Sequence, residues 1–260
     1  MIRLGRSQKE VRVKHIPEVF NAILFGMLLV FPLVEARWNW PRYLKKLASG
    51  KTGARLHHFR NLLIWEWLLT LGFLGSWSWS GKPWSSLLVG HASSIQTLLF
   101  LICAVLFVPV FWRQRRLILA RPAVVERLEK RLEYVKPLLP HIPEERRLFW
   151  AVSATAGICE ETLYRGFLTW YIAGWTGPWP AIILSSLIFG LGHIYLGLKQ
   201  VPQTFLIGLI LALLSCVSGS LWPSIVLHAA IDWNAGELGY ALLNRPSDAE
   251  PEADRSVRTA

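Results

Sequence analysis

The sequence contains seven runs of about 20 mostly apolar residues, and this feature limits the possible folds more than any other. A helix of about 20 residues spans the hydrocarbon core of a bilayer, which is about 30 Å thick. The runs are 17–34, 61–79, 93–112, 148–173, 179–197, 201–221 and 223–243. We therefore expect an all-α, polytopic transmembrane helical bundle with about seven to eight spans.

Basic residues lie between the apolar runs, as they do in the cytoplasmic loops of membrane proteins. Of the 28 Lys and Arg residues, seven lie in 36–60 and ten in 112–147. These two segments would share the cytoplasmic side, with the N-terminus outside although residues 1–15 contain five basic residues. An extra half-span or a re-entrant segment is the alternative. Because the net charge of +11 is spread over such loops, with no separate basic domain, we expect no nucleic-acid partner.

The segment between the third and fourth runs has a helical periodicity of its own. Three apolar residues recur at the spacing of one helix face: Val124, Leu128 and Leu132. Glu126 precedes Lys130 by one turn, which favours an ion pair on the opposite face. We expect an amphipathic helix that lies on the cytoplasmic membrane surface.

Composition divides the chain into three parts. Residues 1–147 are expected to form N-terminal membrane spans with basic cytoplasmic loops, and residues 148–245 a helical core that carries the chemistry. Residues 246–260 are polar and rich in acids, which predicts a disordered tail.

The fourth run contains ionisable residues where a membrane helix is usually apolar. Glu160 and Glu161 are adjacent, and Arg165 follows Glu161 by one turn. Each charge near the centre of a span costs about 2.5–3.5 kcal/mol on insertion scales, so such residues need partners. Glu161 and Arg165 share a helix face and are expected to pair. Glu160 points about 100° away and could act as a general acid or base, an ion-paired structural clamp being the alternative interpretation.

The fifth and seventh runs add two histidines and an aspartate. His193 follows Phe189 by one turn, and His228 precedes Asp232 by one turn, so each pair shares a helix face. Alone, each residue is typical of a packed polar side chain. Together with the acids of the fourth run they predict one polar site inside the bundle, because intramembrane ionisable groups normally contact one another or water.

These motifs resemble those of the CAAX prenyl protease and bacteriocin-processing family of intramembrane proteases, also called CPBP or Abi proteins. The family pattern is EExxxR, then FxxxH, then HxxxN or HxxxD, on separate membrane helices. The matching residues are Glu160, Glu161 and Arg165, then Phe189 and His193, then His228 and Asp232. The resemblance covers roughly residues 145–245.

The resemblance implies an endopeptidase that hydrolyses a peptide bond within or at the membrane. Glu160 and His193 would activate the attacking water, and His228 and Asp232 would stabilise the developing oxyanion. The residues that would hold this geometry are Glu161, Arg165 and Phe189. Because the third motif ends in Asp232 and not in Asn, no side-chain amide is available there to stabilise the oxyanion. Asp232 could donate a hydrogen bond to it only when protonated.

Two ways of activating water stay open. Glu160, His193 and His228 would supply two imidazoles and one carboxylate, a ligand set that suits catalytic zinc with an open position for water. The sequence has no HExxH motif, and a metal-free water activated by Glu160 is equally compatible with it. The resemblance therefore implies a glutamate- or metal-dependent endopeptidase.

The expected partners are the lipid bilayer and a peptide or membrane-protein substrate, and the expected location is the inner (cell) membrane of a bacterium. A non-catalytic relative acting in self-immunity against bacteriocins is one alternative. A proton-coupled transporter is another, although the sequence lacks the inverted repeat and paired broken helices common in transporters. The sequence leaves the oligomeric state open.

Overall fold

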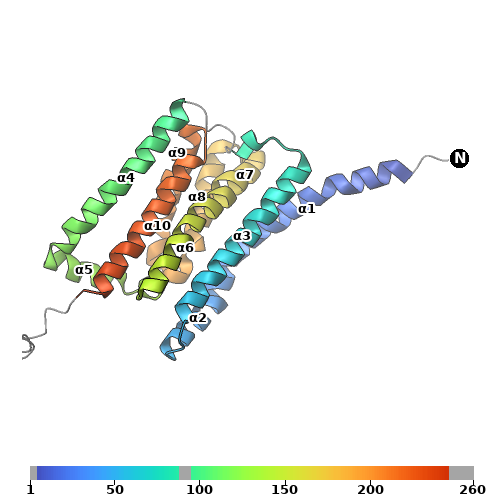
Figure 1. Ribbon diagram of the computed structural model, residues 1–260. Helices are drawn as coiled ribbons and strands as arrows, with labels where there is room; N and C mark the ends of the chain where they lie inside the picture. The colour runs from blue at the N-terminus through green and yellow to red at the C-terminus, as the bar shows by residue number, and fades with distance from the viewer. Residues whose placement is uncertain (1–4, 88–94, 246–260) are drawn as a thin grey trace, which may run out of the picture.

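The computed structural model describes residues 5–87 and 95–245. Within these stretches every regular element is helical, and the helices pack side by side in one bundle (Figure 1). The prediction of an all-α helical bundle is thereby confirmed. The predicted tail, 246–260, and the first two residues of the third predicted span, 93–94, lie outside the described residues.

The seven longest of the described helices are α1 (Gly5–Val34), α3 (Ala54–Ser80), α4 (Ile95–Leu119), α6 (Pro143–Glu160), α8 (Pro178–Gly192), α9 (Val201–Ser218) and α10 (Trp222–Leu243). Shorter helices continue or connect them: α2 (Trp40–Ala48), α5 (Pro122–Leu132) and α7 (Thr169–Thr176). Two π-helical stretches are η1 (Glu35–Asn39) and η4 (Glu161–Leu168). Short 3-10 turns are η2 (Trp84–Leu87), η3 (Lys136–Leu138), η5 (Ile194–Leu196) and η6 (Leu198–Gln200).

Three helical segments of the described chain are long and apolar enough to cross a membrane: Pro17–Ala48, Ile95–Leu119 and Leu198–Ser218. The apolar helix α8 is shorter, with 15 residues. Large apolar side chains are exposed along the outer faces of these helices, and Ile95 and Leu106 of α4 are 78% and 58% exposed. Lipid tails solvate such a surface and water does not. The chain is therefore an integral membrane protein.

The first membrane helix extends further than the apolar run that predicted it. The expected span, 17–34, continues through η1 and α2 to Ala48. On α2, Trp40 and Tyr43 are buried while Lys45 is exposed, so an amphipathic sequence continues the helix past the apolar run. The helix ends before Gly50, whose φ is +67°. The basic segment 36–60 is therefore mostly helix, where a loop was expected.

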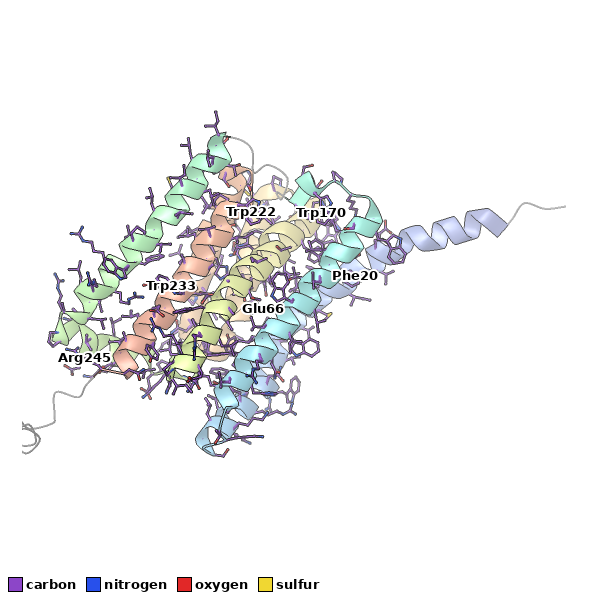
Figure 2. All side chains as sticks on the ribbon, viewed as in Figure 1. Phe20, Glu66, Trp170, Trp222, Trp233 and Arg245 are labelled. Carbon is purple, nitrogen blue, oxygen red and sulfur yellow. The ribbon has the colours of Figure 1, made fainter. Side chains whose placement is uncertain are left out.

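The two most basic segments of the chain lie at one end of the bundle. In Figure 1, α2 and α5 are both at the lower end, where α6 begins. Arg245, labelled in Figure 2, lies at the same end. The positive-inside rule assigns this end to the cytoplasm. The side on which the N-terminus lies stays a prediction.

The expected amphipathic surface helix is α5. Val124, Leu128 and Leu132 are half-buried along one face, and the neighbouring Val125 is fully buried. On the solvent side, the ammonium of Lys130 donates a hydrogen bond to Glu126 at 2.8 Å. Contacts with α4 and α10 hold the helix against the bundle. The amphipathic helix predicted between the third and fourth spans is thereby confirmed.

The fifth predicted span ends earlier than expected. Helix α8 stops at Gly192, and the chain turns through η5 to Gly197, which has a φ of +107°. The sequence had predicted helix up to residue 197. The backbone leaves helical geometry at His193, with φ −102° and ψ 12°, and the short 3-10 turn that follows ends at Gly197, whose positive φ suits glycine. His193 therefore lies at the end of α8 rather than inside a continuous helix.

Helix α6 forms the centre of the bundle, with α10 on one side and α3 on the other. At Gly157 the backbones of α6 and α10 approach closely. A Cβ at this position would lie 2.8 Å from the carbonyl oxygen of Ile225 and 2.9 Å from the Cβ of Ala229. Only glycine fits such a contact. This approach brings the end of α6 next to His228, which precedes Ala229 on α10.

Candidate active site

The acidic pair lies where helix α6 changes its geometry. Glu160 is the last residue of α6, and the π-helical η4 begins at Glu161. All eight residues of η4 are buried. A π-helical turn accommodates an extra residue and redirects the side chains around it, and such turns are frequent at functional sites. The change in geometry thus places the side chains of two adjacent glutamates in different surroundings.

Glu161 and Arg165 form the expected ion pair deep inside the bundle. Oε1 of Glu161 lies 2.9 Å from Nη1 of Arg165, and both side chains are almost completely buried. Nη2 of Arg165 donates a hydrogen bond to the carbonyl oxygen of Gly208 on α9 at 3.1 Å. The guanidinium also lies over the ring of Phe189, 4.1 Å from its centroid. Arg165 therefore links η4, α8 and α9.

His228 is held by the same carboxylate. Its Nδ1 donates a hydrogen bond to Oε1 of Glu161 at 2.8 Å, and the imidazole is buried. A carboxylate oxygen accepts here, so the proton resides on Nδ1. This hydrogen bond fixes the plane of the ring and directs Nε2 away from Glu161.

Nε2 of His228 faces two further carboxylates. Oε2 of Glu160 lies 3.8 Å from Nε2, and Oδ2 of Asp232 lies 3.6 Å from it. These separations exceed a direct hydrogen bond and suit groups bridged by a water or by a substrate oxygen. The side chains of Glu160 and Asp232 are 22% and 37% exposed, whereas Glu161 is fully buried. The two carboxylates that face Nε2 are therefore partly exposed, while the one that holds Nδ1 is sealed inside the bundle.

His193 is oriented by the backbone of its own helix. Its Nδ1 donates a hydrogen bond to the carbonyl oxygen of Phe189 at 3.0 Å. Because a carbonyl only accepts, Nε2 is the nitrogen left to accept from water or a substrate. The ring of Phe189 lies between the two histidines, 5.0 Å from His193 and 5.8 Å from His228 between centroids. The residues of all three motifs are thus brought to one region of the bundle.

Glu66 on α3 is a further carboxylate of this region, which the sequence interpretation missed. It lies halfway along α3, on the side of α6 (Figure 2), and interacts electrostatically with Glu160, Asp232 and His228. Its Oε2 is buried and has no hydrogen-bond partner among the described residues. The sequence signal for Glu66 was its position as a single acid inside the apolar run 61–79. An ionisable group inside a span needs a partner, and this holds for Glu66 as it does for Glu160.

The N-terminal helices also cover the loop that carries His193. The ring of Tyr195 lies 5.0 Å from Trp40 and 6.2 Å from His193, centroid to centroid. This aromatic contact joins α2 to η5, and η1 packs against η5 as well. The first half of the chain, in which the sequence shows no motif, therefore forms part of the wall around the site.

The zinc alternative requires Glu160, His193 and His228 to lie around one common point. Within the described stretches, no group of three or more His, Cys, Asp and Glu side chains is arranged to hold a metal ion. The expected ligands Glu160, His193 and His228 thus do not form a ready-made ligand set. Zinc stays a prediction, and no step proposed below depends on it.

Comparison with known proteins identifies one family. Residues 144–234 match the family model described as Rce1-like, Type II CAAX prenyl endopeptidase. The matched segment begins in the first turn of α6, ends in α10 and contains all seven motif residues. The resemblance to the CAAX prenyl protease family is thereby confirmed for this part of the chain. No curated protein and no solved structure matches the chain.

Proposed function

We propose that this protein is an intramembrane endopeptidase that hydrolyses a peptide bond with water activated by Glu160. The observation that carries the proposal is the arrangement around His228. Its Nδ1 is fixed by Glu161, while its Nε2 faces Glu160 and Asp232 across gaps of 3.8 and 3.6 Å. A purely structural clamp would require only the buried pair of Glu161 and Arg165.

Glu160 is the proposed general base. Its Oε2 is buried without a hydrogen-bond partner among the described residues, although the side chain as a whole is partly exposed. A water that donates to Glu160 and to Nε2 of His193 loses a proton to the carboxylate as its oxygen attacks the carbonyl carbon. When the C–N bond breaks, the protonated Glu160 returns this proton to the leaving amine. One water is consumed, and one carboxylic acid and one amine are formed.

His228 is the proposed stabiliser of the oxyanion. As an imidazolium, it donates from Nδ1 to Glu161 and from Nε2 to the negative oxygen of the tetrahedral intermediate. The ion pair of Glu161 with Arg165 holds this donor in place before substrate binds, so no reorganisation is required during the reaction. Asp232 acts on the same face, and only in its protonated form does it donate a second hydrogen bond.

The substrate of the proposed reaction is a peptide or a membrane protein that reaches the site from the bilayer. Glu160 is the last residue of an 18-residue helix that starts at the cytoplasmic end, so the scissile bond lies within the membrane. The inner membrane of a bacterium is the proposed location. The site itself does not select between a prenylated C-terminus, a leader peptide and a membrane segment.

The test is a cleavage assay on purified protein in lipid nanodiscs. Prenylated C-terminal peptides, leader peptides and a membrane-segment peptide are offered to the wild type and to Glu160→Gln, which keeps the size of the side chain. The matched control is Glu126→Gln, because Glu126 is a glutamate on the outer surface of α5. We expect Glu160→Gln to abolish cleavage, with a loss of at least 100-fold, and the control to be unaffected. Cleavage by a folded Glu160→Gln variant at the wild-type rate would refute the proposed mechanism.

The alternatives predict different results for the same variant. A non-catalytic immunity protein would cleave none of the peptides, and Glu160→Gln would leave its protective phenotype intact. A proton-coupled transporter would show ion flux in liposomes that Glu160→Gln abolishes.

A further inference from the structure

A pocket of about 350 Å³ lies in the elbow between α4 and α5, far along the chain from the motif residues. Its apolar walls are formed by Val110, Leu117, Ile118 and Val124. Two guanidinium groups line it as well, those of Arg113 and Arg121. The pocket thus combines two basic groups with apolar walls.

The two arginines of the pocket have no acidic partner in the described structure. Other basic residues of this region are engaged: Arg115 lies 3.5 Å from Glu237, and Arg116 stacks on Trp112 at 4.2 Å. No Asp or Glu is among the residues that line the pocket. Two positive charges on one concave surface, without neutralisation by the protein, favour an anionic ligand.

The position of the pocket indicates the kind of anion. Helix α4 is one of the membrane-crossing helices, and the pocket lies in its last turns, at the basic end of the bundle. Val110 and Leu117 are more than half exposed, on the side of the helix that continues into the lipid-facing surface. A free phosphate would leave these apolar walls unused, whereas a phospholipid covers them with its acyl chains.

We propose that this elbow binds one anionic phospholipid of the cytoplasmic leaflet. The phosphate of the headgroup accepts hydrogen bonds from Arg113 and Arg121, and an acyl chain lies along Val110 and Leu117. Each basic residue near an anionic lipid surface contributes to the binding free energy, and the loss of both arginines should weaken lipid binding by about 30-fold. The lipid would fasten α5 to the end of α4 and hold the surface helix against α10.

The experiment compares lipid binding to the full chain in detergent, measured as the rise in melting temperature on adding phosphatidylglycerol or phosphatidylcholine. The variant Arg113→Gln with Arg121→Gln is matched by Arg116→Gln with Arg127→Gln, which removes the same charge outside the pocket. We expect phosphatidylglycerol to stabilise the wild type and the control, and to bind the pocket variant about 30-fold more weakly.

Three outcomes would overturn the proposal. If both double variants lost the same part of the stabilisation by phosphatidylglycerol, the lipid would be attracted by the overall positive charge and not by the pocket. If both lipids stabilised the wild type equally, the protein would not recognise the charge of the headgroup. Stabilisation by inorganic phosphate or by an acidic peptide at the same concentration would mean a different ligand. Lipid selectivity of the wild type is tested without any variant, so misfolding of the pocket variant does not remove the test. The readout is independent of proteolysis.

Discussion

Glu161 on η4 and His228 on α10 are 67 residues apart in sequence and joined by a hydrogen bond of 2.8 Å. The oxygen that accepts it, Oε1, is also the one that lies 2.9 Å from Arg165. One buried carboxylate atom therefore sets the position of the imidazole and neutralises the guanidinium. This coupling makes Glu161 a positioning residue, with consequences for both stability and catalysis.

Replacement of Glu161 by Gln should destabilise the protein strongly. Removing one member of a buried ion pair leaves the charge of Arg165 uncompensated and costs about 3–5 kcal/mol. The measurement is thermal unfolding in detergent, with Glu126→Gln as the control because its pair with Lys130 is on the exposed face of α5. If both variants unfolded at the temperature of the wild type, the ion pair would have no structural role.

Replacement of Glu66 by Gln should slow cleavage while leaving the protein folded. The substitution keeps the shape of the side chain and replaces the buried carboxyl group that interacts with Glu160 and His228 by an amide. We expect a fall of about 10-fold or more in kcat/KM, since polar groups interact strongly across a weakly screening interior. Steady-state kinetics in nanodiscs provide the measurement.

The control for Glu66 is another acid at the margin of the bundle. Glu144 is exposed and pairs with Arg147 at 3.2 Å, at the cytoplasmic start of α6. Glu144→Gln makes the same chemical change and should leave kcat/KM unchanged. An equal effect of both variants would show that Glu66 acts only through the overall charge of the protein.

The motif residues could be predicted from the sequence because their spacing encodes their contacts. Glu161 and Arg165 are one turn apart and pair as expected, and His228 and Asp232 share a face of α10. The cost of intramembrane charge then requires these groups to meet. Their order along the chain matches one family, and the match of residues 144–234 confirms it.

Other features depend on contacts that the local pattern does not encode. Whether Glu66 faces α6 or lipid is decided by the rotation of α3, which packing sets. The extension of the first helix to Ala48 results from an amphipathic sequence beyond the first apolar run, and α8 ends at Gly192 in a turn inside the fifth run. The π-helical turn at Glu161 has no simple sequence signature, although it determines which glutamate meets His228.

Removal of metal should leave the proposed activity intact. In the proposed mechanism the carboxylate of Glu160 activates water unaided, so chelation should not affect cleavage. Protein dialysed against a chelator is assayed for cleavage, and its metal content is measured by mass spectrometry. Loss of cleavage that one equivalent of zinc restores would establish the metal-dependent alternative.

Replacement of Gly157 by Ala should reduce stability and activity together. The new methyl group would lie 2.8 Å from the carbonyl oxygen of Ile225, which is backbone and cannot rotate away. Helices α6 and α10 must then separate, at a cost of about 1–3 kcal/mol. Because Gly157 is one turn before Glu161, this movement also lengthens the 2.8 Å hydrogen bond to His228.

The matched substitution for Gly157 is Gly75→Ala on α3, where an added Cβ has no neighbour within 4 Å. Both variants make the same chemical change inside a long helix, so they differ only in the space around the methyl group. Thermal unfolding and cleavage are measured on both. The close approach of α6 and α10 predicts that Gly157→Ala has a lower melting temperature and slower cleavage, while Gly75→Ala matches the wild type. If Gly157→Ala kept full activity at a lowered melting temperature, the position of His228 would tolerate a shift of α10, and the argued role of Glu161 in orienting it would be wrong.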